Sequence, residues 1–371
     1  MNPNLITCRA FALTFIVFAA LGPPSAMVSA AEPPIPKPDG RAADMSKPVK
    51  VFILLGQSNM VGLGRISAEG KAGPEGSLEH AVKSKMKYSY LVDEAGNWSE
   101  RKDVRFVRMM QGDGLMNNEW LGIKGGTIGP EFGIGHRVGD AVDAPVMILK
   151  SCIGNRALGW HLLPPGSTRF EEGGKVYAGY RDAPDSWAKG TEPSPPVIKE
   201  GTITLKGDQP AGWYAGKQYD DDTSDTRKVL ADIGKHYPDA KTYEVGGFFY
   251  WQGEKDAGNP VWAAHYEKNL VQLIKALRKD FNAPSAPFVL GTMGESAKGG
   301  GGNGGKILEA HLAVDGTSGR YPEFKGNVAT IYTNPMAQGG SGNGHYGGKA
   351  EVYMDVGEAM GQAMVKLLGA K

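Results

Sequence analysis

The sequence of 371 residues predicts an α/β protein, a three-layer α/β/α sandwich around a five-stranded parallel sheet. Short apolar runs bounded by glycine or proline recur along the chain, and such runs are typical of strands that are buried on both faces. Amphipathic helical patterns separate these runs, and strands that alternate with helices form βαβ units with a parallel sheet. The five predicted strands are Val49–Leu55, Pro145–Ser151, Tyr243–Trp251, Pro287–Thr292 and Gly326–Thr333.

Four helical patterns accompany these strands. They are Pro130–Val138, Asp225–Tyr237, a long helix that begins at Asn259-Pro260, and Gly347–Leu368. Proline is favoured at the first position of a helix, which supports the first pattern. Ser224 supplies an N-cap for the second pattern, and Pro238 ends it. The third and fourth patterns carry apolar residues on one face, as expected of helices that cover a sheet.

Two long stretches interrupt this alternation, Ser67–Lys124 and Pro164–Asp222. Both are rich in glycine, proline, aspartate and aromatic residues. Connections of this length inside a compact domain are usually functional or carry small elements of their own. We interpret them as insertions that wall a substrate groove, and we expect no second domain.

The N-terminal segment has the pattern of a secretory signal peptide, which we assign to residues 1–31. A positively charged residue precedes the apolar core Phe11–Ala20, and the small residues of Val28–Ala31 suit cleavage. The apolar core is shorter than the roughly 20 residues that a membrane-spanning helix needs. We therefore expect a proline-rich linker at residues 32–47 and one domain at residues 48–371. The protein should be secreted or periplasmic, with no stable membrane span after signal removal.

Composition and cysteine count exclude several classes of protein. The formal net charge of +1 and a near-neutral isoelectric point give no electrostatic case for binding nucleic acid. Cys8 leaves with the signal peptide, so Cys152 has no disulfide partner and no partner for zinc or thiol-redox chemistry. We expect Cys152 to be a small buried apolar residue. The sequence also lacks a His-Glu-x-x-His motif, and we expect no metal and no cofactor. The oligomeric state stays open.

Polar residues follow four of the predicted strands, at the edge of the sheet where parallel α/β proteins bind ligands. They are Gly56-Gln57-Ser58-Asn59 after the first strand, Gly154-Asn155 after the second, Trp251-Gln252-Gly253-Glu254 after the third and Gly344-His345 after the fifth. Taken alone, the first segment fits a tight turn as well as a nucleophile, because glycine and asparagine are common in connections.

Together these residues supply a complete mechanism for acyl transfer. That reaction needs a hydroxyl nucleophile, a base that takes its proton and donors for the oxyanion. Ser58 and His345 are the candidates for nucleophile and base. The candidate oxyanion donors are the main-chain N–H groups of Ser58 and Gly154, with a side-chain amide from Gln252 or Asn155. A glycine at position 154 lets the backbone approach the substrate closely.

These motifs resemble the SGNH hydrolase superfamily, and within it the sialate O-acetylesterase-like carbohydrate esterases. The first block of that family resembles Gly56–Met60 and implies Ser58 as nucleophile, with Gln57 as a supporting residue. Gly154 matches the glycine of the second block, and His345 matches the histidine of the last. The third block resembles Trp251–Glu254, where Gln252 stands in for the oxyanion asparagine of other branches. The resemblance runs from Val49 to the last helix, and it implies an SGNH, flavodoxin-like fold.

One position departs from the superfamily pattern. An aspartate usually lies three residues before the histidine, and here that residue is Gly342. His345 would then work with Ser58 as a dyad, oriented by a main-chain carbonyl or by a carboxylate from elsewhere. Glu254 and Asp256 are the nearest candidates by their place after the third strand. For Glu254 we favour a structural hydrogen bond that holds the loop.

The sequence thus predicts an exported serine esterase that removes O-acetyl groups from an acetylated carbohydrate. One alternative is a glycan-binding protein on a catalytically degenerate esterase scaffold, which the missing aspartate suggests. Another is an esterase for acyl groups that are not carried by sugars. Tryptophans near the site loops would suit sugar faces, although core packing explains tryptophan at least as often. These tryptophans are Trp120, Trp160, Trp213 and Trp251.

Overall fold

The computed structural model describes residues 1 and 34–369, apart from 70–72, 111–113, 194–196, 200–201, 205–212, 339 and 341–343. It divides the chain into the segment Met1–Pro34 and a compact unit, Ile35–Lys371. Except for Met1, the predicted signal peptide lies outside the described residues. Part of the predicted linker belongs to the compact unit, since Ile35 is buried in its core and Lys37 pairs with Glu94 at 2.7 Å.

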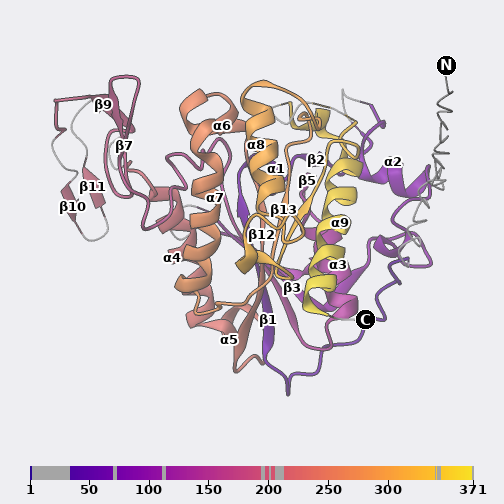
Figure 1. The fold of residues 1–371 in the computed structure, drawn as a ribbon. Helices are drawn as coiled ribbons and strands as arrows, with labels where there is room; N and C mark the ends of the chain where they lie inside the picture. Colours follow the sequence, from indigo (N-terminus) through magenta and orange to yellow (C-terminus); the bar gives the residue numbers. More distant parts are fainter. Residues whose placement is uncertain are drawn as a thin grey trace. The chain divides into compact units, whose positions relative to one another are not determined.

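A seven-stranded sheet forms the centre of the compact unit, in the order β14-β13-β12-β1-β6-β3-β4 (Figure 1). All five predicted strands are present and parallel to their neighbours, which confirms the predicted fold class. Their bounds are β1 Val49–Gly56, β6 Val146–Ser151, β12 Tyr243–Trp251, β13 Phe288–Gly291 and β14 Val328–Ile331. The first strand, β1, lies between β6 and β12, so the ends of these three strands meet in the middle of the sheet.

The sheet has two strands more than the five we predicted. β3, Glu100–Met110, pairs in parallel with β6, and β4, Gly114–Gly122, pairs antiparallel with β3. Both come from the stretch Ser67–Lys124, and interpreting that whole stretch as a wall of the groove was wrong. The first four residues of β3 are charged and two arginines interrupt the apolar residues after them, which obscured the strand in the sequence.

Helices cover both faces of the sheet, as predicted for a three-layer sandwich (Figure 1). Alternate residues of β1 belong to different core clusters, because successive side chains of a strand point to opposite faces. One cluster joins β1 to α3, Glu131–Ala141, and α9, Ala350–Leu368. The other cluster joins it to α4, α7 and α8. These helices are α4 Lys217–Ala231, α7 Pro260–Asp280 and α8 Gly302–Ala313.

The helix α4 begins earlier than its predicted start at Asp225. Its first two turns carry Asp220 and Asp222, which have no apolar periodicity but do have partners. Asp222 accepts hydrogen bonds from Ser151 Oγ at 3.0 Å and from Gln218 Nε2 at 2.8 Å. Polar contacts therefore hold the start of this helix, and the apolar pattern did not reveal it.

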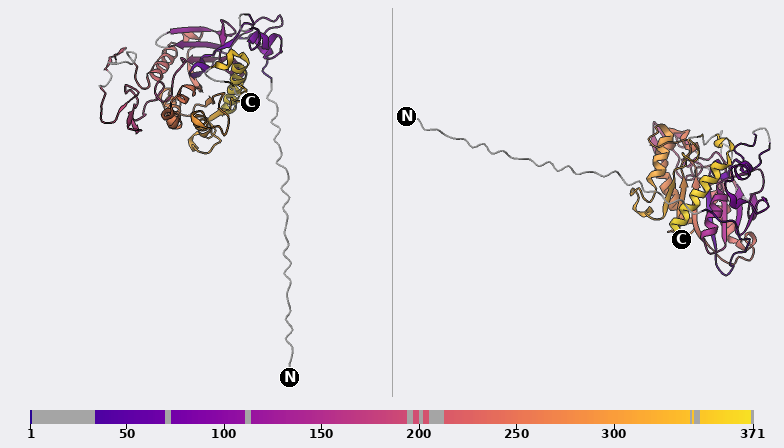
Figure 2. Two further views of the ribbon diagram at one scale, coloured as in Figure 1. Left: turned by 90° about the horizontal axis from the view of Figure 1, so that it is seen from above. Right: turned by 90° about the vertical axis from the view of Figure 1, so that its right-hand side faces the viewer.

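The second long stretch carries small strands of its own. A three-stranded antiparallel sheet contains β7 Phe170–Glu172, β8 Lys175–Tyr177 and β9 Ser186–Ala188. A hairpin contains β10 Val197–Lys199 and β11 Thr202–Thr204. Figures 1 and 2 show these small strands out to the side of α4 and α7, away from α9.

The remaining elements are short. They are α1 Ser58–Val61, β2 Gly64–Arg65, α2 Leu78–Lys83, β5 Thr127–Ile128, α5 Ile233–His236, α6 Glu254–Ala257, and the 3₁₀ turns η1 Ser89–Leu91, η2 Pro322–Phe324 and η3 His345–Gly348. Within the described part of the chain, no helix is long and apolar enough to cross a bilayer.

Candidate active site

The turn from β1 into α1 delivers Ser58 to the edge of the sheet. Gly56 has φ of 148°, and a Cβ there would lie 2.3 Å from the carbonyl oxygen of Trp251, so only glycine fits. The Gln57 N–H donates to the same carbonyl at 3.2 Å, which pins the turn to β12. Ser58 is the first residue of α1 and lies directly beyond the strand end.

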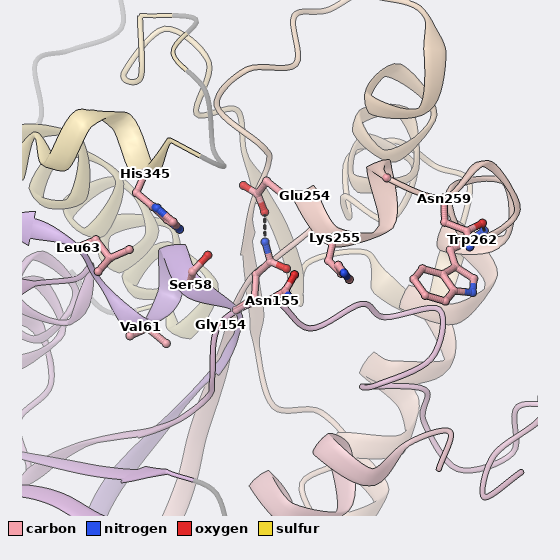
Figure 3. A pocket seen from close by; sticks show the side chains of 12 residues that line it. Ser58, Val61, Leu63, Gly154, Asn155, Glu254, Lys255, Asn259, Trp262 and His345 are labelled. Carbon is pink, nitrogen blue, oxygen red and sulfur yellow. Dashed lines mark hydrogen bonds between the residues drawn. The ribbon is translucent and has the colours of Figure 1, made fainter. Parts of the chain in front are cut away.

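A cavity of about 810 Å³ opens at the carboxyl ends of β1, β6 and β12 (Figure 3). It contains every predicted site residue except Gln252. The lining residues are Gln57, Ser58, Val61, Leu63, Gly154, Asn155, Glu254, Lys255, Gly258, Asn259, Trp262 and His345. Residues nearly 300 positions apart in the sequence thus meet at one cavity.

Ser58 and His345 both face this cavity from adjacent elements. Figure 3 shows the Ser58 hydroxyl and the His345 ring directed into the same space. Among the described residues, no hydrogen bond joins the two side chains, and no carboxylate bonds the His345 ring. The position of Gly342 lies outside the described residues. Catalytic hydrogen bonds are often long in unliganded enzymes and tighten when substrate binds.

The end of β6 brings two further hydrogen-bond donors close to Ser58, the main-chain N–H of Gly154 and the side-chain amide of Asn155. A Cβ on Gly154 would lie 3.4 Å from the Ser58 Cβ, so the two main chains are close. Within the described residues, the N–H groups of Ser58 and Gly154 donate to no other part of the protein. Asn155 is exposed in the left-handed region at φ of 60°, and its side-chain amide has no described partner either. These groups have the chemistry of an oxyanion hole.

Gln252 lies beneath the cavity and does not line it. The side chain is fully buried, and its Nε2 donates to the Arg156 carbonyl at 2.8 Å and to Asp256 Oδ2 at 2.6 Å. Its Oε1 accepts from the Tyr266 hydroxyl at 2.8 Å. Both amide hydrogens are therefore used inside the protein, and in this arrangement Gln252 positions the turn after Asn155 instead of donating to an oxyanion.

Glu254 holds both residues that flank Ser58. Its Oε2 accepts from Gln57 Nε2 at 2.6 Å, and its Oε1 accepts from Asn59 Nδ2 at 2.8 Å. The side chain is buried, and this burial raises the pKa of Glu254 to about 7, with the nearby charge of Glu295 adding to the rise. The donated hydrogen bonds act in the opposite direction. Both carboxylate oxygens of Glu254 therefore already accept hydrogen bonds from the nucleophile-side turn.

Asp256 makes a parallel set of contacts on the other side. Its two oxygens accept from the N–H groups of Leu158 at 2.8 Å and Gly159 at 2.7 Å, besides the bond from Gln252. Burial raises the pKa of Asp256 to about 6. Both carboxylates that we considered as orienting groups for His345 are thus bonded elsewhere.

The cavity also contains residues that the sequence analysis did not single out. Lys255 and Trp262 lie across from His345, and Figure 3 shows the Lys255 ammonium directed into the cavity between Asn155 and Trp262. Among the described residues, no carboxylate pairs with Lys255. The strand-end argument could have found both, because they follow Glu254 in α6 and the first turn of α7.

None of the four tryptophans that we predicted near the site lines the cavity. Trp251 and Trp160 are buried, at 0% and 5% exposure. Trp120 packs edge-on against Tyr237, 5.3 Å between ring centroids. Trp262 is the tryptophan that lines the cavity.

The fourth strand end was also overlooked. Glu295 follows β13 in the segment Thr292–Ser296, and its charge raises the pKa of Glu254. It also contributes to the raised pKa of Tyr346, after burial and Glu254. Glu295 therefore lies near the carboxylate that supports the nucleophile turn.

Metal ligation and thiol chemistry find little support in these residues. Within the described ranges, no group of three or more His, Cys, Asp or Glu residues is arranged to hold a metal ion. Cys152 is unpaired and buried in the core cluster around β1, and burial raises the pKa of its thiol to about 12. A thiol in that state is a poor nucleophile.

The geometry agrees with a comparison of sequence families. Residues 212–366 match the model of a carbohydrate esterase family, described as sialic acid-specific acetylesterase. Over these residues the chain is similar to that family. This match agrees with the resemblance drawn from the motifs and with the predicted enzyme class. The matched region contains Gln252, Glu254 and His345, whereas Ser58 and Gly154 precede it.

Three solved structures of other proteins are similar to this chain at low sequence identity. A protein from Arabidopsis thaliana is 16% identical, with 86% of this chain and 98% of that chain covered and a TM-score of 0.47. A carbohydrate acetylesterase from Xanthomonas citri is 13% identical, with 85% and 55% covered and a TM-score of 0.46. NanS is 14% identical, with 81% and 79% covered and a TM-score of 0.40. No curated protein sequence matches the chain.

Proposed function

We propose that this protein is an exported serine esterase that removes O-acetyl groups from carbohydrate by a Ser–His acyl-enzyme mechanism. One observation carries the proposal. A hydroxyl, an imidazole and two main-chain N–H groups from three distant segments share one cavity: Ser58, His345 and Gly154. The family match of residues 212–366 supports the acetyl ester as the bond that is cleaved.

The first half of the reaction forms an acetyl-enzyme. Ser58 Oγ attacks the acetyl carbonyl carbon while His345 accepts the hydroxyl proton. The oxyanion accepts hydrogen bonds from the N–H groups of Ser58 and Gly154, and the Asn155 amide is the third donor within the cavity. When the tetrahedral intermediate collapses, the C–O bond to the sugar breaks and His345 returns the proton to the leaving alcohol.

The second half reverses these roles with water. His345 takes a proton from a water molecule, which attacks the acetyl carbonyl of the acyl-Ser58 ester. The same N–H groups stabilise the second oxyanion. Collapse releases acetate, and the proton on His345 returns to Ser58 Oγ. Ser58 and His345 are the catalytic residues of this scheme, and Gln57, Gln252 and Glu254 are positioning residues.

The side of the cavity remote from His345 suits a sugar ring. Trp262 presents an indole to the cavity, and aromatic rings stack on the apolar faces of sugars. Lys255 and Asn259 add polar groups that could bond sugar substituents. A cavity of about 810 Å³ lies within the range of small-molecule sites, roughly 300–1,000 Å³.

Export is the part of the proposal that rests on sequence pattern alone. Residues 1–31 act as a signal peptide, residues 32–47 link it to the esterase domain at residues 48–371, and the mature protein is secreted or periplasmic. N-terminal sequencing of protein recovered from the periplasm and from the medium tests this. A mature chain that still begins at Met1 would contradict it.

A glycan-binding protein on a degenerate scaffold is the second candidate. It is favoured by Gly342 and by the lack of a described carboxylate at the His345 ring. Release of acetate from acetylated xylan and from a chromogenic acetate ester, lost in Ser58→Ala, decides for the esterase. Glycan binding without release of acetate from any acetyl ester decides against it. A series of chromogenic esters tests the acyl group, since faster turnover of long chains would contradict the acetyl assignment.

A further inference from the structure

The candidate base lies in a turn of unusual backbone conformation. Four consecutive residues have positive φ, at 50° for His345, 54° for Tyr346, 63° for Gly347 and 71° for Gly348. Glycine adopts this conformation freely, but residues with a Cβ rarely do. The turn places two side-chain-bearing residues in that region, so surrounding contacts must hold it in place.

Tyr346 makes those contacts. Its side chain is 5% exposed, and its ring stacks on Trp251 with 5.9 Å between centroids and 15° between planes. Trp251 is itself fixed, because its Nε1 donates to the Thr292 carbonyl at 2.9 Å. A Cβ on Gly294 would lie 2.6 Å from the Tyr346 ring, so the chain needs glycine there to admit the phenol. The residue after His345 is thus anchored in the core.

The Tyr346 hydroxyl connects this turn to the nucleophile turn. It accepts a hydrogen bond from Asn59 Nδ2 at 3.3 Å, and the same amide donates to Glu254 Oε1 at 2.8 Å. Asn59 is the residue directly after Ser58 and is fully buried. One short chain of buried groups therefore runs from the residue after the candidate base to the residue after the candidate nucleophile.

We propose that Tyr346 is the positioning residue of the base, and that its hydroxyl sets the separation of Ser58 and His345 through Asn59. In the superfamily pattern an aspartate near the histidine orients the ring directly. Here the corresponding residue is Gly342, and the turn is instead anchored through its main chain by the neighbouring phenol. The inference rests on the proposed function, because it requires Ser58 and His345 to be the reacting pair.

The test removes only the hydroxyl. Tyr346→Phe keeps the ring and its stacking on Trp251, and we expect kcat on a chromogenic acetate ester to fall roughly tenfold while KM stays within about twofold. The rate at which a fluorophosphonate labels Ser58 should fall in proportion, because labelling reports activation of the hydroxyl without sugar binding. The fraction of protein labelled at the end point counts the folded active sites, so that kcat can be expressed per active site. This separates misplacement of His345 relative to Ser58 from loss of folded protein.

Tyr353→Phe is the matched comparison. Tyr353 is also buried, and its hydroxyl donates to the Oδ1 of the same Asn59 at 3.3 Å, but it belongs to α9 and is not adjacent to His345. Both variants lose one buried hydrogen bond to Asn59, so their melting temperatures should fall by similar amounts. We expect the loss in kcat and in labelling rate to be several-fold greater in Tyr346→Phe.

Two results would overturn the inference. One is an unchanged kcat per active site in Tyr346→Phe, and the other is an equal loss in the two variants, which would indicate a general role for Asn59. Ser58→Ala separates this failure from failure of the proposed function. If Ser58→Ala still releases acetate, the proposed function fails; if it does not and Tyr346→Phe is unaffected, only the role of Tyr346 fails.

Discussion

Two turns bring the proposed reacting groups to the cavity, and they are supported very differently. The nucleophile turn, Gly56–Val61, is held by Glu254 through Gln57 and Asn59, and by the buried Lys150 ammonium through the carbonyls of Met60 and Val61. Lys150 also pairs with the buried Glu131 at 2.7 Å. Two buried ionisable side chains thus hold the turn that carries Ser58.

The base turn, His345–Gly348, is held by fewer buried polar contacts. It uses left-handed backbone at four positions, and its buried anchor is the single phenol of Tyr346. This difference implies that changes around the base turn should lower activity more than stability. Changes around the nucleophile turn should lower both, because they expose or unpair buried charge. The predictions below test this contrast.

Loss of the base itself should have the largest effect on activity. His345→Ala leaves the Ser58 hydroxyl without a proton acceptor, and we expect kcat on acetate esters to fall by roughly 10³-fold or more. The melting temperature should change little, because the imidazole is only partly buried and has no described hydrogen-bond partner. Steady-state kinetics and thermal unfolding measure both quantities. A loss in kcat below tenfold would mean that another group takes the proton.

Glu254→Gln tests the nucleophile turn. The new amide nitrogen would face the amide of Gln57 or Asn59, so one of the two hydrogen bonds is lost. We expect kcat to fall by roughly 10- to 100-fold and the free energy of unfolding to fall by about 1–3 kcal/mol. Asp256→Asn is the matched control. It also replaces a buried carboxylate by an amide, but Asp256 bonds Leu158, Gly159 and Gln252 and not the residues beside Ser58. A Glu254→Gln variant with lowered kcat and unchanged stability would contradict the difference that we infer between the two turns.

The pH dependence of stability should carry the signature of Glu254. Its pKa is raised by burial from the ordinary value to about 7, so the folded state binds a proton at pH values where the unfolded state has lost it. The contribution of Glu254 to the free energy of unfolding is therefore largest at low pH. It is lost as pH rises from about 4.5 to about 7, by roughly 3 kcal/mol at most. Denaturant unfolding at several pH values should show this slope, flattened in Glu254→Gln. An equal slope in that variant would contradict the assignment.

The smallest expected effect concerns the sugar side of the cavity. Trp262→Ala should raise KM for an acetylated oligosaccharide roughly tenfold and leave KM for a small chromogenic acetate nearly unchanged. Trp120→Ala, in a strand remote from the cavity, is the control and should change neither. If KM rises equally for both substrates in Trp262→Ala, the indole stabilises the local fold at the start of α7 and does not bind the sugar.

The elements that could be predicted share a simple pattern. The five predicted strands are almost continuously apolar, and most of the site residues that line the cavity follow one of them closely. Ser58 and Gly154 were found in this way, because the ends of parallel strands meet at one edge. The family match then supports the third and last motifs, which lie within residues 212–366.

The features that were missed depend on tertiary contacts. β3 carries many charged residues because it lies near the edge of the sheet, and these charges find partners outside the strand; Arg101, for example, pairs with Asp140 of α3 at 2.5 Å. Gln252 was expected in the cavity, but its amide is drawn inward by Asp256. Tyr346 gave no sequence signal, since its role depends on the distant Asn59.

Detection of the acetyl-enzyme tests the central claim most directly. The protein is mixed with an acetate ester, quenched in acid within the first turnovers, and mapped by mass spectrometry of its peptides. The account predicts an acetyl group on Ser58, absent in Ser58→Ala, together with loss of acetate release in that variant. Continued release of acetate by Ser58→Ala, with no acetyl group on the peptide around residue 58, would contradict it.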